Sequence, residues 1–445
     1  MSYVCKRAYH RQLTTGKIRL LVSLIQAFDE MSFVNKYNEI KLILVESLLE
    51  AFPLAEGDEI EAVVTHWLQS PTANIPFLTA SMRDKCWSLV EESTRKRKQV
   101  MRVLEHEATY QASLPIEWAD VPFPPPEKSR FRFIDLFAGI GGFRIAMQEL
   151  GGHCVFSSEW DPYAKRTYET NFGEVPFGDI RKISEEEIPD HEVLCAGFPC
   201  QPFSLAGVSA RKSLHTAHGF ACETQGTLFF DIVRIIKAKQ PQIVFLENVR
   251  NLVGHDEGKT FSIIKSTIEK LGYSFSYKLI DSSPLVPQRR IRCYMVCIRG
   301  GGKDFSFPDI QGPPLPLKSI LESSVDESYT ISSKLWEGHQ RRTNRNLARG
   351  TGFTAFCADL EKPSNTIVAR YGKDGKECLI TQDRKNPRML TPRECARLQG
   401  FPESFVIPHA KTTSYRQFGN SVAIPVIRKI SEEIVRMLLD SEEGV

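Results

Sequence analysis

The sequence predicts an α/β protein with a doubly wound, Rossmann-like domain, preceded by a helical extension and followed by a smaller domain. Three observations support this fold class. From Phe131 onward, short apolar runs alternate with helical stretches. Before that point, apolar residues recur at helical spacing. After Arg299 the alternation weakens, and Gly, Pro, Ser, Thr and basic residues fill the stretch to about Pro387.

Length and composition narrow the class of protein. With 445 residues, two or three domains are expected at roughly 100–200 residues each. Hydrophobic residues make up 42% and charged residues 25%, which excludes a wholly disordered chain, a collagen and a coiled coil. No apolar run approaches the ~20 residues of a membrane span, and the first residues lack a secretory core. We therefore expect no membrane partner, an intracellular, reducing compartment, and eleven cysteines kept as thiols.

The first 120 residues are expected to form a helical extension. One amphipathic stretch ends before Pro53 and carries its apolar residues at helical spacing, namely Leu44, Val45, Leu48, Leu49 and Phe52. Residues 121–130 read as a stiff linker, because four prolines in five positions exclude both a helix and a central strand.

Residues 131–300 are expected to form the sheet domain. Its strands are predicted from the runs FRFIDLF, HCVFSSE, HEVLCAG, PQIVFLEN and RCYMVCI, which we expect to be parallel and joined by crossover helices. A smaller domain over 301–409 follows, and the segment 410–445 carries an amphipathic helix from about Ile424.

The first strand runs into a glycine turn, in which Gly139 and Gly141 allow a tight bend and close approach to a ligand. The dinucleotide fingerprint requires a third glycine where Arg144 stands, so a nicotinamide dehydrogenase is disfavoured. A turn of this kind also occurs simply for packing. A ligand without a pyrophosphate suits the turn best.

Glu159 lies twenty residues after Gly139 at the end of the second predicted strand, where a carboxylate can bind a ribose diol. Trp160 beside it suits an adenine, and Asp179 supplies a second carboxylate, unless it is only a helix cap. These residue types favour a nucleoside cofactor, with S-adenosylmethionine as the candidate.

Cys200 is the sharpest candidate for chemistry. A buried strand leads directly into Gly197, Pro199 and Pro202, so the cysteine sits on a rigid loop at the carboxyl end of the strand, where ligands bind in α/β sheets. A nucleophilic thiolate is the functional interpretation. The ordinary alternative, a small buried hydrophobe, is our expectation for Cys5, Cys86, Cys154 and Cys395.

Glu247 ends another apolar strand, where partial burial raises a carboxyl pKa and keeps a proton available. A surface carboxylate is the alternative. Gln288, Arg290 and Arg292 alternate along an extended segment, so that one face presents two guanidiniums able to hold a carboxylate, a base carbonyl or a phosphate.

These residues, in this order, resemble the DNA (cytosine-5)-methyltransferase family of prokaryotic type. Six blocks match in unpermuted sequence: DLFAGIGG, GFPCQPFS, LENV, QRRIR, LTPRECARLQGFP and YRQFGNSVAIPV. The resemblance runs from about Phe131 to the C-terminus and does not cover residues 1–120. It implies an S-adenosylmethionine-dependent methyltransferase domain with a smaller target-recognition domain, and a segment 410–445 that returns to the methyltransferase domain. It also implies a cytoplasmic location in a prokaryotic or phage-like context.

The resemblance implies a mechanism on a cytosine rotated out of duplex DNA. Cys200 attacks C6, Glu247 delivers a proton to N3, and Arg290 and Arg292 orient Glu247, the base or its phosphate. The cofactor pocket would be lined by Phe137, Gly139, Gly141, Glu159, Trp160, Asp179, Ile180, Leu228 and Asn420. No metal is expected.

DNA contacts are expected from two regions. The loop after Cys200 would contribute Gln201, Ser204, Arg211 and Lys212. The smaller domain would contribute guanidiniums suited to guanine edges or phosphates, together with a tyrosine, namely Arg341, Arg342, Arg345, Arg349, Arg370 and Tyr371. Lys373–Lys376 are predicted to form a hairpin turn with Asp-Gly in the favoured position. The loop and the ARYGKDGKE segment resemble enzymes that act on CCWGG or GGWCC sites.

Other functions stay open at this stage. A tRNA methyltransferase of the same family is disfavoured by the long arginine-rich segment, and a zinc deaminase lacks the P-C-x-x-C ligands. A DNA-binding regulator on the same scaffold is disfavoured by the intact Cys200 and Glu247, although both roles can coexist. We expect a monomer, acting in restriction-modification or as an orphan enzyme, with a cognate endonuclease sharing its site without a stable complex.

Overall fold

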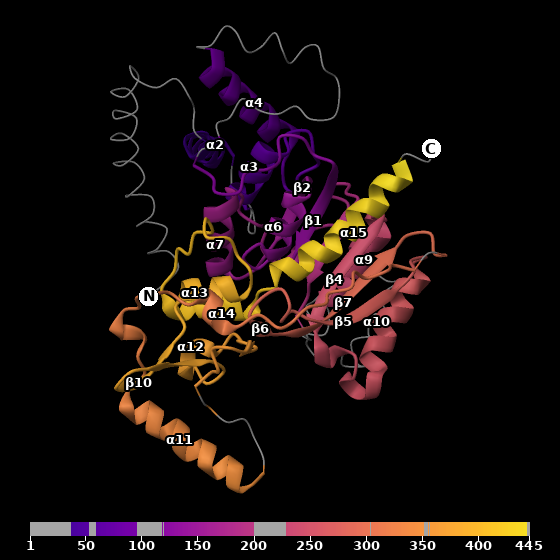
Figure 1. Cartoon of the computed structure of the whole chain (residues 1–445). Coiled ribbons are helices and arrows are strands. Elements are labelled where there is room, and N and C mark those ends of the chain that lie inside the picture. The colour runs from indigo at the N-terminus through magenta and orange to yellow at the C-terminus, as the bar shows by residue number, and fades with distance from the viewer. Residues whose placement is uncertain are drawn as a thin grey trace, which may run out of the picture.

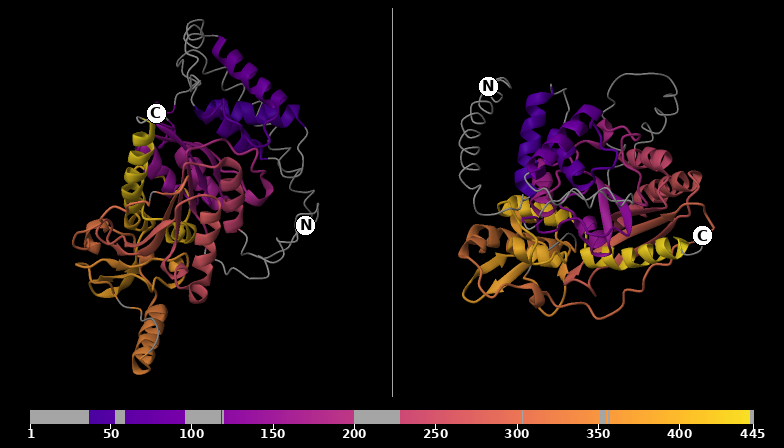
Figure 2. Two further views of the ribbon diagram at one scale, coloured as in Figure 1. Left: turned by 90° about the vertical axis from the view of Figure 1, so that its right-hand side faces the viewer. Right: turned by 90° about the horizontal axis from the view of Figure 1, so that it is seen from above.

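The computed structural model describes residues 37–52, 59–95, 118, 120–199, 228–302, 304–350, 355 and 357–442 (Figure 1). A six-stranded sheet forms its centre, with helices on both faces (Figures 1 and 2). Among the described helices, none combines the length and apolarity needed to cross a membrane.

The sheet is mixed rather than wholly parallel. Its spatial order is β2 (Gly152–Ser158), β1 (Phe131–Leu136), β3 (Val193–Gly197), β4 (Ile243–Val249), β7 (Ile291–Ile298) and β5 (Ser276–Asp281). The first four strands are parallel, as predicted. The RCYMVCI strand, β7, was expected to be parallel, and this is wrong: β7 runs antiparallel to both β4 and β5. Apolar runs indicate burial on both faces but not strand direction.

Alternate residues of the strands feed two separate cores. Phe133 of β1 and Phe245 of β4 point to one face, together with the apolar residues of α6 (Gly142–Glu149), α7 (Pro162–Phe172) and α15 (Ile424–Glu442). Ile134 and Leu246 point to the other face, against α9 (Leu228–Lys239) and α10 (Lys259–Lys270). This two-sided burial makes the sheet doubly wound and brings the C-terminal helix onto the first strands.

The helical extension contains α2 (Tyr37–Ala51), α3 (Ile60–Gln69) and α4 (Ala80–Arg95). Leu44 and Leu48 are fully buried, as their spacing predicts, whereas Leu49 is exposed. Helix α3 also joins the sheet core, because Ala62 and Val63 pack with β1 and β2 residues. Figure 1 shows the three helices lying next to the β1–β2 end of the sheet.

A buried polar cluster joins the extension to the sheet domain. Arg144 of α6 and Glu174 are both fully buried, with Nη1 and Oε1 2.8 Å apart. Arg144 also donates to Gln69 of α3 (2.6 Å), and the Ser157 backbone N–H donates to His66 of α3 (3.1 Å). Although burial alone would raise it, the Arg144 guanidinium keeps the pKa of Glu174 below its usual value. Gln69 and His66, both on α3, are therefore part of the buried polar cluster around the Arg144–Glu174 ion pair.

The region after residue 300 contains short, irregular elements. They are α11 (Ser333–Ala348), β8 (Ser364–Asn365), α12 (Tyr371–Asp374), β9 (Leu379–Gln382), β10 (Lys385–Met389), α13 (Pro392–Leu398) and α14 (Lys411–Asn420). β8 pairs in parallel with β6 (Gln288–Arg289), which connects the region to the start of β7. Single 3-10 turns fill other connections, at Ile180–Lys182, Arg250–Leu252, His255–Gly258, Leu317–Ile320 and Glu327–Tyr329.

The hairpin predicted at Lys373–Lys376 is wrong. Asp374 ends the short helix α12, and Gly375 caps it with a left-handed backbone (φ +63°). Asp-Gly also suits a helix C-terminus, since glycine accepts that conformation without strain. The hairpin of this region joins β9 to β10 instead, around Asp383 and Arg384.

Candidate active site

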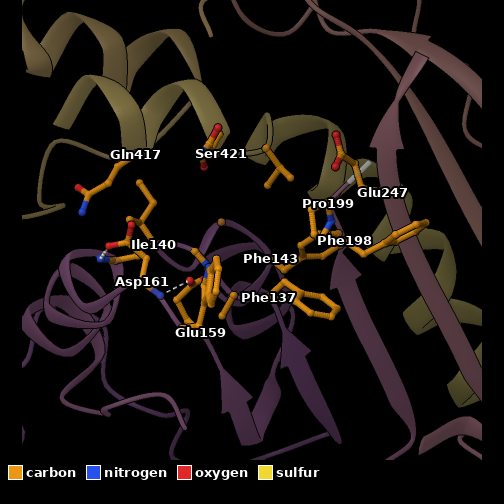
Figure 3. A pocket seen from close by; sticks show the side chains of 18 of the residues that line it. Phe137, Ile140, Phe143, Glu159, Asp161, Phe198, Pro199, Glu247, Gln417 and Ser421 are labelled. Atoms are coloured by element: carbon orange, nitrogen blue, oxygen red, sulfur yellow. Dashed lines mark hydrogen bonds between the residues drawn. The ribbon is translucent and has the colours of Figure 1, made fainter. Parts of the chain in front are cut away.

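One cavity of about 940 Å³ opens at the carboxyl ends of β1, β2, β3 and β4. Figure 3 shows Glu159 and Asp161 at one end of it and Glu247, with Phe198 and Pro199, at the other. Its lining includes Phe137, Gly139, Glu159, Trp160, Asp179, Ile180, Leu228, Glu247, Arg290, Arg292 and Asn420. Eleven residues that sequence analysis singled out, from distant parts of the chain, therefore surround one space.

The turn after β1 lines the end of the cavity that contains Glu159 and Asp161. We call this the cofactor end, because the cofactor-binding residues predicted from the sequence lie there. Phe137 and Gly139 both have positive φ angles, +57° each, and Gly141 has φ +86°. A Cβ on Gly139 would meet almost nothing, its nearest neighbour being the Phe137 carbonyl oxygen at 4.0 Å. A Cβ on Gly141 would lie 2.2 Å from the Phe172 ring. Gly139 therefore leaves open space for a ligand, whereas Gly141, absent from the cavity lining, permits helix packing.

Glu159 is held by two backbone N–H groups. Gly139 donates to one carboxylate oxygen and Asp161 to the other, each at 2.8 Å. Burial raises the pKa of Glu159, and the two hydrogen bonds oppose that rise. Trp160 next to it is 75% exposed, so its ring is available at the rim of the cavity.

Asp179 lies at the adjoining wall and caps the turn Ile180–Lys182. It accepts hydrogen bonds from the Arg181 backbone (3.1 Å) and guanidinium (2.6 Å), and the guanidinium bond lowers the pKa of Asp179. The helix-cap alternative is therefore present, and Asp179 also lines the cavity. Leu228 at the start of α9 and Asn420 at the end of α14 complete this side.

Cys200 lies outside the described residues, but the strand leading to it does not. β3 ends at Gly197, opposite Glu247 in the parallel register with β4. The Asn248 side chain donates to the Phe198 carbonyl oxygen (3.0 Å), which fixes the chain where it leaves the sheet. Phe198 and Pro199 then line the same cavity as Glu247.

Glu247 is 8% exposed at the end of β4. Its Oε1 lies 3.2 Å from Nε of Arg292, which projects from the neighbouring antiparallel strand β7. Burial raises the pKa of Glu247, while Arg292 and then Arg290 oppose the rise. Burial is the larger of these opposing causes, and it favours the protonated form that a proton donor needs.

Arg290 has different contacts. It is 3% exposed and donates to three backbone carbonyls, those of Ile367 (3.2 Å), Ser421 (2.5 Å) and Gly419 (3.4 Å). Burial lowers the pKa of Arg290, and the positive charge of Arg292 adds to that effect. The side chain therefore connects the start of β7 to the smaller region and to residues 415–426, the last of the six motif blocks. We call these residues the C-terminal block.

Similarity to known proteins identifies the family of this chain. Residues 131–436 match the family described as C-5 cytosine-specific DNA methylase. The chain belongs to this family. It is an enzyme that methylates cytosine in DNA at C5.

Curated relatives are similar over most of the methyltransferase. The Type II methyltransferase M.SsoII of Shigella sonnei is 50% identical over 334 residues, covering 73% of this chain and 85% of the relative. A DNA-cytosine methyltransferase of Escherichia coli is 41% identical over 378 residues, covering 70% of this chain and 79% of the relative. Among solved structures, the Schizosaccharomyces pombe Dnmt2 methyltransferase gives a TM-score of 0.56 at 20% identity, covering 70% and 99% of the two chains. At 20% identity, this likeness shows that the two chains share a fold.

Helix α11 carries the predicted DNA-contacting arginines of the methyltransferase. It extends away from the rest of the molecule in Figures 1 and 2. Arg341, Arg342 and Arg345 lie on it and Arg349 caps it, and all four are exposed. Arg342 Nη1 lies 3.7 Å from Asp374 of α12, and Arg341 pairs with Glu337. The helix places basic side chains well outside the catalytic cavity.

The remaining predicted DNA contacts separate into three groups. Arg370 is exposed at the start of α12. Tyr371 was expected to contact DNA, and the structure corrects this because the side chain is fully buried. Its hydroxyl donates to the Cys378 carbonyl (2.7 Å) and accepts from the Leu390 N–H (2.8 Å). The side chain is therefore not available to DNA. The third group lies outside the described residues and comprises Gln201, Ser204, Arg211 and Lys212.

Asp161 and Arg416 are among the cavity residues of the methyltransferase that the sequence did not point to. Asp161 caps α7 by accepting from the Tyr163 and Ala164 N–H groups, and Arg416 of α14 lies 2.7 Å from it. The ion pair connects the C-terminal block to the cofactor end. The Asp-Pro start of a helix was a readable signal for the cap, but its partner across the chain was not.

Cys86, Cys154 and Cys395 are buried free thiols, as predicted, and burial raises the pKa of each. Cys5 lies outside the described residues.

Proposed function

We propose that this methyltransferase takes the methyl group from S-adenosylmethionine and transfers it to a cytosine rotated out of duplex DNA, at sites of the CCWGG or GGWCC class. One observation carries the proposal. A single cavity has Glu159 and Asp179 at one end and Glu247, Arg292 and Pro199 at the other. A methyl donor and a pyrimidine can therefore meet in one enclosed space.

The residues at the cofactor end fit an adenosyl group. Each oxygen of Glu159 already accepts one backbone N–H and retains a lone pair for a ribose hydroxyl. The open space over Gly139 admits a ligand close to the backbone, and the exposed Trp160 ring offers a stacking surface. When bound, the cofactor supplies an electrophilic methyl group.

The other residues act on the cytosine. The Cys200 thiolate forms a bond to C6, and Glu247 donates its proton to N3, which draws charge from the ring and makes C5 nucleophilic. After C5 has taken the methyl group, loss of the C5 proton to solvent re-forms the C5–C6 double bond and expels Cys200 as a thiolate, and N3 returns its proton to the Glu247 carboxylate. Arg292 keeps the Glu247 carboxyl in place, and Arg290 keeps the strand and the C-terminal block together.

We further propose that α11 and Arg370 contact DNA, since an exposed cationic helix attracts phosphates over a distance of about 8 Å at physiological salt. The enzyme would act as a cytoplasmic monomer in restriction-modification or as an orphan. Any cognate endonuclease would share the site without a stable complex. The relatives' names, Type II and DNA-cytosine methyltransferase, support DNA over tRNA as substrate.

A mechanism-based trap tests the proposal. Duplex DNA carrying 5-fluorocytosine at the target position, mixed with the protein and S-adenosylmethionine, is expected to give a covalent complex visible by denaturing electrophoresis. The Cys200→Ser variant is expected to give none while still binding DNA. A stable cross-link with this variant, or none with the wild type, would remove Cys200 from the mechanism.

Bisulfite sequencing of DNA from cells that produce the wild-type chain identifies the site. We expect methylated cytosines confined to CCWGG or GGWCC sequences. Methylation in other contexts would refute the site class but not the chemistry, and C200S serves as the background control.

A further inference from the structure

The segment 174–178 contacts two of the residues that carry carboxylates at the cofactor end, Glu159 and Asp179. It leads from α7 to Asp179 and runs beside β2. The Phe177 N–H donates to the Ser157 carbonyl (2.9 Å), and the Glu159 N–H donates to the Phe177 carbonyl (2.8 Å). A shift of this short segment would therefore move Asp179 directly and Glu159 through a backbone hydrogen bond.

The other side of the segment is covered by the helical extension. Thr65 of α3 accepts a hydrogen bond from the Val175 N–H (3.0 Å). The Phe177 ring packs against the His66 ring of α3, with centroids 4.6 Å apart, and against Phe77, at 6.2 Å. The segment thus lies between β2 and the extension.

Glu59, directly before α3, makes the contact nearest the cavity. Its Oε1 accepts the Gly178 N–H at 2.9 Å, and its Oε2 lies 2.8 Å from Nζ of Lys165 on α7. A Cβ on Gly178 would lie 2.6 Å from Oε1, so a glycine is needed for this approach. Gly178 itself lines the cavity and precedes Asp179.

We propose that Glu59 is a positioning residue for the cofactor: by holding the backbone at Gly178, it presets Asp179 for the adenosyl group. This inference rests on the proposed use of S-adenosylmethionine. Glu59 precedes residue 131, where the family match begins, so the extension supports the cavity by a contact to Gly178 without lining it. Presetting a binding group raises affinity because less ordering is left for the ligand to impose.

Calorimetric titration with S-adenosylhomocysteine, the unreactive product, tests the role of Glu59. Glu59→Ala removes a charge-assisted hydrogen bond, and we expect affinity to fall roughly tenfold. KM for the methyl donor should rise by a similar factor, while kcat at saturating donor and KM for DNA stay unchanged. A residue that only stabilises the fold would lower the melting temperature without this split.

Two matched variants isolate the Gly178 contact. Glu59→Gln keeps a carbonyl acceptor for the Gly178 N–H and is expected to restore affinity to within about threefold of wild type. Lys165→Met removes the ion-pair partner of Glu59 but leaves the Gly178 hydrogen bond, and should bind as wild type does.

Several outcomes would overturn the inference. One is a folded E59A with unchanged affinity. Another is an equal loss in Lys41→Ala, which breaks the 2.7 Å ion pair between α2 and Glu169 of α7 away from the cavity, because that would mean general docking of the extension. If E59A fails to fold, Glu59→Asp, whose carboxylate is one methylene too short, decides by the same titration. Wild-type protein that binds no S-adenosylhomocysteine would instead refute the cofactor itself.

Discussion

The two ends of the cavity hold their carboxyl groups by different means. At the cofactor end, both oxygens of Glu159 accept backbone N–H groups that the turn after β1 and the start of α7 fix in place. At the other end, Glu247 is more deeply buried than Glu159 and faces the guanidinium of Arg292. A carboxylate with rigid donors suits binding, whereas a buried carboxyl beside a side-chain cation suits proton transfer. The two ends therefore predict separable effects on binding and on rate.

The largest effect is expected from Glu247→Gln. An amide of the same shape cannot deliver a proton to the base, and general acid catalysis contributes about 10²–10⁴-fold. We expect kcat to fall within that range, with cofactor affinity unchanged, as measured by single-turnover methylation and by calorimetry. Loss of cofactor binding in this variant would abolish the proposed separation between the two ends.

Glu159→Gln should give the complementary result. Its side-chain NH₂ must face either the Gly139 or the Asp161 N–H, so one hydrogen bond is replaced by repulsion. We expect cofactor affinity to fall about 10- to 100-fold, while DNA affinity and kcat at saturating cofactor change little. An unchanged dissociation constant in titration would rule out Glu159 as a ligand for the ribose.

The smallest effect is a shift in pH dependence caused by Arg292→Met. Arg292 opposes the rise in the pKa of Glu247, so its removal should raise that pKa further. Since the proton donor must be protonated, activity is lost as pH rises through this pKa. The basic limb of the kcat–pH profile should therefore move to higher pH.

The control for this profile is E247Q, in which the limb should be absent. A limb that stays in place in the Arg292 variant would mean that another group limits the reaction at high pH.

Local sequence patterns predicted the parallel part of the sheet and the residues around the cavity, because both follow from features a few residues long. Apolar runs of strand length, a glycine turn and a carboxylate after a strand each have a local physical cause, and parallel strands bring their carboxyl ends to one edge. Glu159, Asp179 and Glu247 could be placed together for that reason.

What could not be predicted depends on contacts between distant residues. The direction of β7 is set by its neighbours in space, and β5 escaped notice because most of its side chains are partly exposed. Tyr371 reads as an exposed residue in a polar, basic segment, yet it packs against Tyr415 from another helix. The association of α3 with β2 likewise depends on residues that carry no motif.

The polar cluster around Arg144 has a practical consequence for anyone who wishes to work with the methylase part by itself. The family match begins at residue 131, but a truncated chain starting there would expose the Arg144–Glu174 pair to partial solvation and strip it of Gln69 and His66. A clone that begins at the first motif would thus lack α3, which shares a buried polar cluster with the sheet domain. If such a protein were insoluble, this would not show that the full chain lacks methyltransferase activity. A useful cloning boundary keeps α2 and α3 with the methylase part, because Tyr37 of α2 also donates to the Gly173 carbonyl at 2.6 Å.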